Sequence, residues 1–585
     1  MLFDTLVAMR RLFVPALCVA ALAAFVSPVL ADMVGQAQSF LVNTSYDASG
    51  AGTVSATLRA AGSHGYFYID DWYWATLSPV EQSQFNTSLN ALSVQFDSTI
   101  YPRVTSFYGS ENTPGIDADP HVVVMMERLI SGSGGYFETI HNYTKARAPN
   151  SNAREMVYVN VDSVSNANGK TYVAHEFQHL ISFNQKELLR NVQDDVWLNE
   201  ARSEYAITVA GYSEPYEGST LQRRAQAFAR APSDSLVDWP NTSVDYAIAS
   251  VFLHYLSDRY GSDIIASTTR TAAAGVAAID EWLSQNGKTE RFCDVFSDWM
   301  VASYLNDRGI DPRYGYIHDG LRQIHVAPIV SAQLYGAGQR SDYSASLKDW
   351  QPLWVENAIV SAGSAAAVNV RISGSSDAAW RGAVVAKYRD GSGRVIPFLS
   401  VFGGADIAAP AQSNGSDIVS VTVAVGQGTS QPVGNRIIDA KPVTVTISSG
   451  EISGVIVTPM PTVIPTPQSI QPINGDLIRR VGQSEIYVVW GPYRRYLPQG
   501  TLKLYGFENR PVTEVTDDVF FRYSTSNYVR EEGQKKVYAL WPDGTKHWMN
   551  ITTAQWDASA RDWGAIFTVN SSEITWYATG PDIIR

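Results

Sequence analysis

The segment His175-Glu176-Phe177-Gln178-His179 combines residue types and a spacing that suit a hydrolytic metal site. In an α-helix, residues four apart lie on one face, so both imidazoles can reach one zinc ion. Glu176 then lies beside the metal without binding it, and its carboxylate can take a proton from the attacking water and pass it to the leaving amine. The metal would lower the pKa of that water and polarise the scissile carbonyl.

A second segment, WLNEARSEYA from Trp197, supplies carboxylates that can complete this site. Glu200 makes a set of two histidines and one glutamate, which leaves a fourth position open for water, as catalytic rather than structural zinc requires. Glu204 faces the same side of a helix, and we expect it to accept the free ring N–H of a ligating histidine while Asn199 orients the same turn. In the alternative arrangement Glu204 binds the metal and Glu200 supports it.

The elements that must position these residues change along the chain. Up to about residue 165 the pattern is mixed, with expected strands at 65–69, 121–126 and 156–161 and a helix at about 79–108. From Lys170 to about Asp307 the apolar spacing predicts successive amphipathic helices. The paired motifs fall where the mixed half, which ends near residue 168, gives way to the helical half. We therefore predict one α+β domain over residues 32–335.

The C-terminal part of the chain shows strand patterns instead. Short alternating strands separated by Gly, Ser and Asp predict a β-sandwich over residues 336–452. The proline-rich run VTPMPTVIPTPQSIQP predicts an extended linker over 453–474. GQSEIYVVWGPYRRYLP is echoed by GQKKVYALWPDGTKHWMN, which predicts a duplicated β-rich module over 475–585. The expected chain is multidomain.

Aromatic residues are frequent in this last module. They are candidates for contact with a polymer or a cell surface, although an aromatic preference of strand faces and small cores explains them as well. The aromatic residues concerned are Trp490, Tyr493, Tyr496, Trp541, Trp548 and Trp556.

The N-terminus and the overall charge indicate where the protein acts. Arg10 and Arg11 precede a nearly apolar run over residues 12–25, and Ala31 ends a small-residue site, which predicts a signal peptide over residues 1–31 with Met9 as a candidate start. An uncleaved membrane anchor is the alternative. The formal net charge of -13 argues against a nucleic-acid partner, since phosphate binding needs clustered lysine and arginine. We expect a secreted protein.

The two helix motifs resemble those of the gluzincin clan of metallopeptidases. Within that clan, AHEFQHLISF, WLNEARSEYA and SNAREMVYVN are most similar to the hyicolysin family of secreted neutral metallopeptidases, over about Ser63 to Leu305. The resemblance implies a zincin-like fold for the α+β domain, one catalytic zinc ion, and a peptide or protein substrate. The separation of His179 from Glu200 is slightly longer than in better-known clan members, which affects the course of the intervening loop.

The resemblance also implies two further roles. SVDYAIASVFLHYLSDRYG is similar to a segment that carries an oxyanion-stabilising tyrosine in related aminopeptidases, and the matching residue is Tyr246, with a packing tyrosine as the alternative. The lysine-glycine pair that follows in those enzymes is absent, and His254 is a weaker competitor. Substrate in this clan lies along a sheet edge, which Gly135 and Tyr136 would provide, an ordinary turn being the alternative.

These observations predict a zinc-dependent endopeptidase. A zinc exopeptidase is the first alternative, but no G-x-M-E-N-like anchor for a free amine precedes His175. The second is a surface or matrix-binding protein with an inactive zinc domain, against which the complete set of His175, Glu176, His179 and Glu200 argues. Acidic segments such as GIDADP are compatible with calcium, but turn-forming aspartates explain them, so no calcium site is assigned. The oligomeric state stays open.

Overall fold

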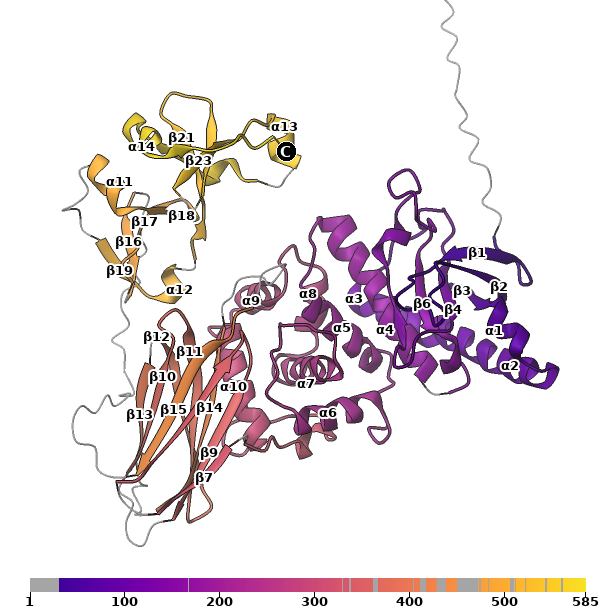
Figure 1. Cartoon of the computed structure of the whole chain (residues 1–585), viewed down its shortest axis with the longest axis horizontal. Helices are drawn as coiled ribbons and strands as arrows, with labels where there is room; N and C mark the ends of the chain where they lie inside the picture. The colour runs from indigo at the N-terminus through magenta and orange to yellow at the C-terminus, as the bar shows by residue number, and fades with distance from the viewer. Residues whose placement is uncertain are drawn as a thin grey trace, which may run out of the picture. The chain divides into compact units, whose positions relative to one another are not determined.

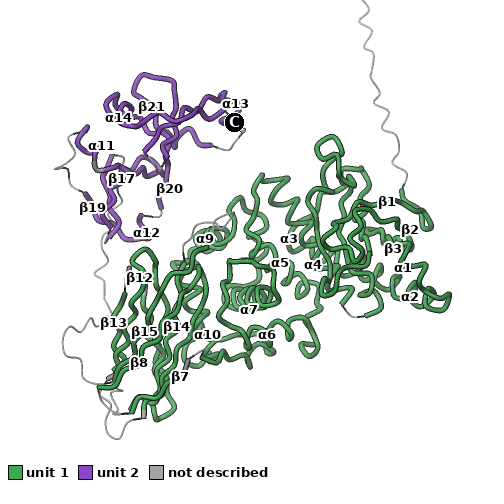
Figure 2. The backbone as a smooth tube through the Cα atoms, viewed as in Figure 1, with its two compact units in different colours: residues 1–458 green, residues 459–585 purple. Residues whose placement is uncertain are grey.

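The computed structural model describes two compact units, residues 1–458 and 459–585 (Figure 2). The predicted signal peptide, apart from Ala31, and most of the predicted linker lie outside the described residues. The description covers residues 31–585 except 167, 329, 336–337, 361–366, 403, 411–416, 429–437, 450–471, 473–474, 482, 506–509, 511, 521, 542–543, 559–560 and 585.

A mixed sheet forms the N-terminal part of the first unit, in the strand order β1-β2-β3-β4-β6-β5 (Figure 1). β3, β4 and β6 run parallel, and β5 pairs antiparallel with β6 at the sheet edge. Every residue of β3 and β4 is buried, as expected for strands covered on both faces. The strands are β1 (Ala37–Leu41), β2 (Thr53–Ala61), β3 (Gly65–Asp70), β4 (Val122–Glu127), β5 (Gly135–Tyr136) and β6 (Met156–Asn160).

Alternate residues of these strands enter two different cores. Val124 and Val157 face the large core shared with the helices, whereas Val123 and Tyr158 face a smaller core on the other side of the sheet. The expected helix over 79–108 is one continuous run, begun by a Ser78–Glu81 capping box and interrupted by a π-helical turn. Its parts are α2 (Pro79–Gln95), η1 (Phe96–Ile100) and α3 (Tyr101–Tyr108), and α1 (Asp71–Thr76) precedes it.

The predicted helical half is present as a series of packed helices. α4 contacts β6, α3 and α5, so it lies between the sheet and the rest of the helices. The π-helix η4 continues α4 without a break. These elements are η2 (Thr139–Asn142), η3 (Val161–Ser163), α4 (Asn168–Ser182), η4 (Phe183–Leu188), α5 (Val196–Val209), α6 (Thr220–Arg230), α7 (Ser243–Tyr260), α8 (Asp263–Thr269), α9 (Val276–Gln285), α10 (Phe292–Leu305) and η5 (Leu321–Gln323).

Two further sheets complete the first unit and share one hydrophobic core. Their orders over the described strands are β13-β10-β15-β8 and β12-β11-β14-β9-β7. Inward residues of both, such as Val370 and Val445 from one and Val384 and Val423 from the other, meet in that core. The strands are β7 (Val330–Tyr335), β8 (Arg340–Leu347), β9 (Leu353–Val360), β10 (Ala367–Gly374), β11 (Ala379–Tyr388), β12 (Gly393–Phe402), β13 (Gly404–Pro410), β14 (Ile418–Gln427) and β15 (Lys441–Ser449).

The second unit contains two small sheets with the same pairing pattern. In each, an antiparallel three-stranded meander is flanked on both sides by a parallel strand, giving β19-β16-β17-β18-β20 and β24-β21-β22-β23-β25. The elements are β16 (Leu477–Arg480), β17 (Ile486–Trp490), β18 (Tyr493–Leu497), α11 (Gln499–Leu504), β19 (Val512–Val515), α12 (Asp517–Phe520), β20 (Ser524–Thr525), β21 (Tyr528–Glu531), β22 (Val537–Leu540), β23 (Thr545–Trp548), α13 (Thr553–Ala558), η6 (Trp563–Ala565), β24 (Ile566–Val569), α14 (Ser571–Trp576) and β25 (Ala578–Thr579).

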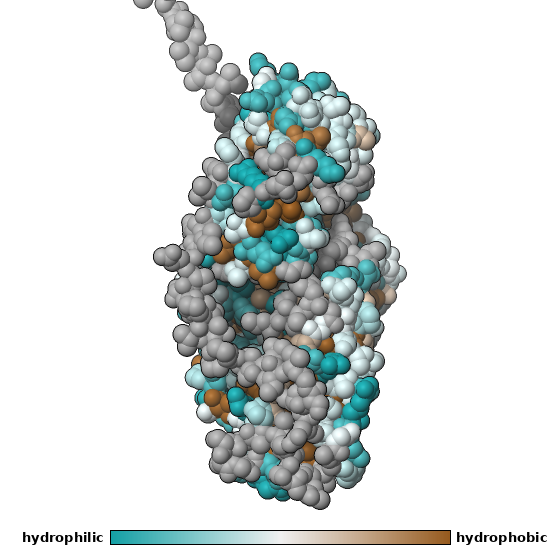
Figure 3. All heavy atoms as spheres, turned by 90° about the vertical axis from the view of Figure 1, so that its left-hand side faces the viewer, coloured by the Kyte–Doolittle hydropathy of each residue, from teal (hydrophilic) through white to brown (hydrophobic). Residues whose placement is uncertain are grey.

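Some aromatic side chains of the second unit reach the surface. Trp490, Tyr496 and Trp541 of the second unit are exposed, whereas Trp556 is buried. Hydrophobic residues form small separate patches on the face shown in Figure 3. None of the helices among the described residues is long and apolar enough to cross a membrane.

The helices and the strand-rich region of the first unit share a core. α10 packs against β11 and β14, and Trp350 meets Phe292 edge to face with ring centroids 4.6 Å apart. Trp354 of β9 is fully buried, and its Nε1 donates to the Met300 carbonyl oxygen over 2.9 Å. Strands β9, β11 and β14 therefore pack directly against helix α10.

Removing the Trp354 side chain should destabilise the first unit. We expect Trp354→Ala to lower the free energy of unfolding by about 3–5 kcal/mol, because it opens a large cavity and leaves a carbonyl without its donor. Urea denaturation measures the change. Trp72→Ala is the control, since Trp72 is 59% exposed and stacks on Arg128, and it should cost about 1 kcal/mol or less. Equal losses of unfolding free energy in the two variants would contradict the conclusion that Trp354 stabilises the shared core.

Candidate metal centre

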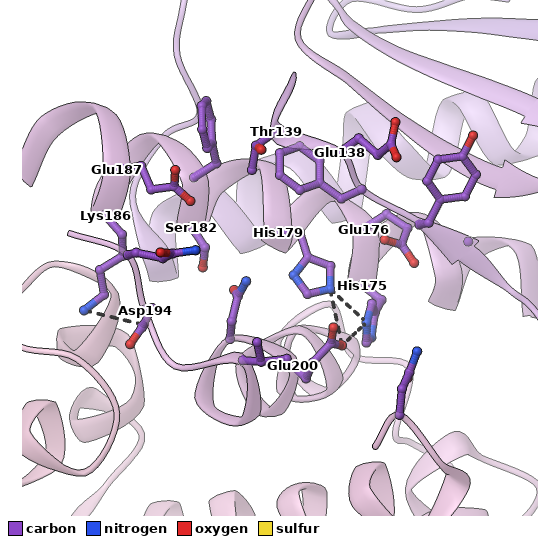
Figure 4. Close-up of a pocket in the computed structure, with 18 of the residues that line it drawn as sticks. Glu138, Thr139, His175, Glu176, His179, Ser182, Lys186, Glu187, Asp194 and Glu200 are labelled. Carbon is purple, nitrogen blue, oxygen red and sulfur yellow. Dashed lines mark hydrogen bonds and ion pairs between the residues drawn. The ribbon is translucent and has the colours of Figure 1, made fainter. Parts of the chain in front are cut away.

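Three predicted ligands converge at the junction of α4 and α5. His175 Nε2 and His179 Nε2 lie 3.2 Å apart, and Glu200 Oε2 lies 3.2 Å from the first and 3.4 Å from the second (Figure 4). Tetrahedral zinc with ligand distances of about 2.0–2.1 Å separates its ligand atoms by roughly 3.3–3.4 Å. The triangle of His175, His179 and Glu200 therefore fits one such ion and leaves one coordination position open.

The local sequence explains why these side chains meet. α4 buries every residue from Val173 to Ser182, so its position is fixed on all sides. Phe177, on the face opposite the cleft, packs against Phe96 and Tyr101 with ring centroids 5.2 Å and 5.5 Å away. With that face anchored, the helical spacing directs both histidines toward α5.

Each histidine has a partner for its other ring nitrogen. Glu204 Oε1 lies 3.4 Å from His175 Nδ1, on the far side of the ring from the triangle. Ser203 Oγ lies 3.1 Å from His179 Nδ1 and donates to Gln178 Oε1 over 2.6 Å. Such contacts fix the tautomer and orientation of a ligating imidazole.

Sequence reasoning identified Glu204 but not Ser203 or Arg224. Arg224 of α6 binds both Glu204 oxygens, from Nε over 2.8 Å and from Nη2 over 2.9 Å. Burial opposes ionisation of Glu204, but the charge of Arg224 and the hydrogen bond with His175 lower its pKa to about 2. Ser203 follows Glu200 by three residues, so helical spacing could have placed both side chains on one face of α5. No spacing rule predicts Arg224, because it belongs to another helix, α6.

Glu176 lies beside the triangle and faces the sheet edge. Burial raises the pKa of its carboxyl to about 7, against the lowering influence of the two histidines. A Cβ atom on Gly135 would approach Glu176 Oε1 to 2.7 Å and the Tyr158 carbonyl oxygen to 2.7 Å. Only glycine permits this close approach of β5 to Glu176.

Tyr136 lines the cleft and also anchors β5 through its side chain, which is 5% exposed. Its ring stacks between Tyr46 and Tyr158, with centroids 4.7 Å and 4.3 Å away. Its hydroxyl donates to Glu127 Oε1 over 2.6 Å and accepts the Asn43 backbone N–H over 3.1 Å. Burial raises the pKa of Glu127 to about 8, despite this hydrogen bond.

Tyr246 of α7 lines the same cleft as the triangle. Its ring lies 6.2 Å from that of His175, and its hydroxyl donates to Asn241 Oδ1 over 2.8 Å. The Arg224 guanidinium lies 4.8 Å from the Tyr246 ring centroid, so one arginine contacts both Tyr246 and Glu204. Burial and the nearby carboxylates raise the pKa of Tyr246, which keeps its hydroxyl a proton donor.

His254 and Asn199 have different surroundings. His254 is buried away from the cleft lining, where Nδ1 donates to the Ser250 carbonyl oxygen over 2.8 Å and Nε2 accepts from Thr208 Oγ1 over 3.0 Å. Burial lowers its pKa to about 4, so it is neutral. Asn199 lines the cleft, and among the described residues its buried Oδ1 has no hydrogen-bond donor.

The cleft has a volume of about 360 Å³ and extends to both sides of the triangle. One end is bordered by Asn241 and Tyr246, and the other by Lys186 and Glu187 of η4. β5 forms a wall, where the backbone of Gly135 reaches the site. An extended chain could therefore pass the triangle rather than end at it.

Comparison with known proteins finds a distant similarity to a metalloprotease. No family model matches the chain. It is 27% identical over 208 residues to the neutral metalloprotease ShpI of Staphylococcus hyicus, a match that covers 31% of this chain and 45% of that protein. The chain thus spans less than half of this relative, and it shares distant homology with a metalloprotease.

Removing Arg224 should destabilise the site without touching the ligands. Glu204 has a side-chain exposure of 4% and would lose its cation, whereas Arg224 itself is 24% exposed. We expect Arg224→Met to lower the free energy of unfolding by about 2 kcal/mol, below the ~3–5 kcal/mol typical of breaking a fully buried pair. Chemical denaturation tests this. Arg223→Met, on the same helix with exposed partners, is the matched control and should change stability by less than about 0.5 kcal/mol.

Proposed function

We propose that this chain is a secreted zinc-dependent endopeptidase of the gluzincin type. The observation that carries the proposal is the triangle of His175 Nε2, His179 Nε2 and Glu200 Oε2, with sides of 3.2 to 3.4 Å. Two imidazoles and one carboxylate are the donor set of catalytic zinc sites that retain an open position. The distant similarity to a neutral metalloprotease supports the same chemistry.

The wider organisation follows from this proposal and from the sequence. A zincin-like peptidase domain would occupy residues 32–335, followed by a β-sandwich, a Pro/Thr-rich linker and the duplicated module. The apolar N-terminal segment supports secretion. Exposed Trp490 and Trp541 lie at the ends of β17 and β22, so these positions remain candidates for contact with a polymer or cell surface.

In peptide hydrolysis, some residues of the chain would bind the metal ion and another would transfer the proton. A divalent ion held by His175, His179 and Glu200 would supply Lewis acidity, which polarises the scissile carbonyl and makes water more acidic. Glu176 would accept a proton from the attacking water and deliver it to the leaving amine nitrogen. Glu176 is buried beside β5, which would limit the access of bulk water to this carboxylate while a substrate is bound.

Two further groups would hold the substrate. The Tyr246 hydroxyl, now bonded to Asn241, would donate instead to the carbonyl oxygen as negative charge develops there. The backbone of β5, at the edge of the sheet, would pair with an extended peptide. Space on both sides of the triangle favours internal cleavage over removal of terminal residues.

The first test is cleavage of a peptide blocked at both ends by the zinc-loaded protein and by Glu176→Gln. We expect wild-type cleavage within the peptide, its loss on chelation and its return with zinc, while the variant keeps one zinc equivalent and loses activity by about 10³-fold. Mass spectrometry and metal analysis provide the measurements. Glu217→Gln, at an exposed glutamate outside the cleft, is the control. Undiminished cleavage by Glu176→Gln would refute the role of Glu176.

Tyr246→Phe separates an oxyanion donor from a packing residue. We expect kcat to fall by roughly 10²–10³ with little change in KM or zinc content, because the lost hydrogen bond forms mainly in the transition state. Tyr260→Phe removes a hydroxyl that is bonded to Glu290 outside the cleft and should behave as wild type. Wild-type kcat in Tyr246→Phe would show that Tyr246 only packs.

A further inference from the structure

The helix that carries the two histidines also forms the wall of the cleft beyond them. Ser182, Phe183, Lys186 and Glu187 line the cleft in continuation of the face of His175, Glu176 and His179 (Figure 4). Their spacing is that of one helical face, and it is carried through the π-helical turn η4. Glu187 follows His179 by eight residues, about 12 Å along a helix axis. Glu187 therefore lies at a fixed distance from the triangle of His175, His179 and Glu200.

Lys186 is unable to offer its charge to a ligand. Its side chain is 2% exposed, and its Nζ donates to the carbonyl oxygens of Ala273 over 2.6 Å and Thr271 over 3.1 Å. Asp194 Oδ2 lies 3.6 Å from this Nζ and 2.6 Å from Nη2 of Arg202. Burial and the charge of Arg202 lower the pKa of Lys186 to about 8. Lys186, Asp194 and Arg202 therefore neutralise one another's charges.

Glu187, in contrast, has no close cation among the residues that the structure describes. Within the described part of the chain its carboxylate makes no hydrogen bond and no ion pair, although it is partly buried. Burial raises the pKa of Glu187, and the charge of Arg147 offsets only part of that rise. The Arg147 guanidinium stacks on the Tyr143 ring, 3.9 Å from its centroid. A cation entering the cleft would compensate for the lost hydration of Glu187.

The surroundings of Glu187 select among possible cations. Thr139, Ser182 and Gln193 line the same cleft, so a group with several N–H donors finds polar side chains there. The distance from the triangle requires a long side chain, which lysine and arginine have. An acidic side chain would meet Glu187 with like charge, and it could not reach the enclosed Lys186.

We infer that Glu187 selects a lysine or arginine side chain close to the cleaved bond. This inference rests on the proposed endopeptidase function and adds a substrate class to it. Glu187 acts here as a specificity-determining residue, separate from the groups that perform hydrolysis.

The test uses peptides blocked at both ends that differ at one position near the cleaved bond. That position carries arginine, its neutral isostere citrulline, norleucine or glutamate, after mapping of the cleavage site by mass spectrometry. We expect kcat/KM for the arginine peptide to exceed that for the citrulline peptide about tenfold, and the ratio to fall to near one in Glu187→Gln. Glu187→Lys should favour the glutamate peptide, a gain that simple loss of structure would not produce. Added salt should reduce the preference.

A binding measurement keeps this inference separate from the proposed function. In the Glu176→Gln background, calorimetry should show about tenfold tighter binding of the arginine peptide than of the citrulline peptide, and Glu187→Gln should remove the difference. If the wild-type protein cleaves none of these peptides while the Glu187-dependent binding preference persists, the endopeptidase function is refuted but the selectivity is not. Equal binding of both peptides, a preference that persists without Glu187, or a wild-type preference for glutamate would overturn the inference.

Discussion

The packing of α4 against α5 is the constraint on which the site depends. Two imidazoles and a carboxylate meet at distances near 3.3 Å, and groups so close are held together only by well-fixed helices. Phe177 fixes one side of α4 through Phe96 and Tyr101. The helices thus hold the three groups in an arrangement that one small dication fits, with little reorganisation needed to bind it.

Buried charge pairs hold the helices that surround the contact between α4 and α5. Arg224 holds Glu204 against His175 and also contacts the Tyr246 ring, so α6 links a supporting carboxylate to a candidate oxyanion donor. Below the cleft, Arg202 and Asp194 form a buried pair that Lys186 joins. Removing one member of such a set would leave a buried charge uncompensated, which ties the positions of the helices to one another.

The sheet contributes through its edge. β5 is only two residues long, yet Tyr136 holds it in a stack of three tyrosines and in a hydrogen bond to Glu127. The side chain anchors the strand from the far face of the sheet, and Gly135 brings the backbone close to Glu176. A short edge strand fixed in this way combines an open pairing edge with a defined distance to the site.

The sequence alone indicated a multidomain chain of helices and sheets, because apolar periodicity identifies elements such as α4, α5, α7 and the strands after residue 340. It also singled out His175, His179 and Glu200, because helical spacing is a local property of the chain. Ser203 and Arg224 were missed, as were the enclosure of Lys186 and the side on which Tyr136 lies. Those features depend on which helix faces meet and on which face of the sheet a side chain occupies. Only tertiary packing decides them, since contacts between residues distant in sequence leave no spacing pattern to recognise.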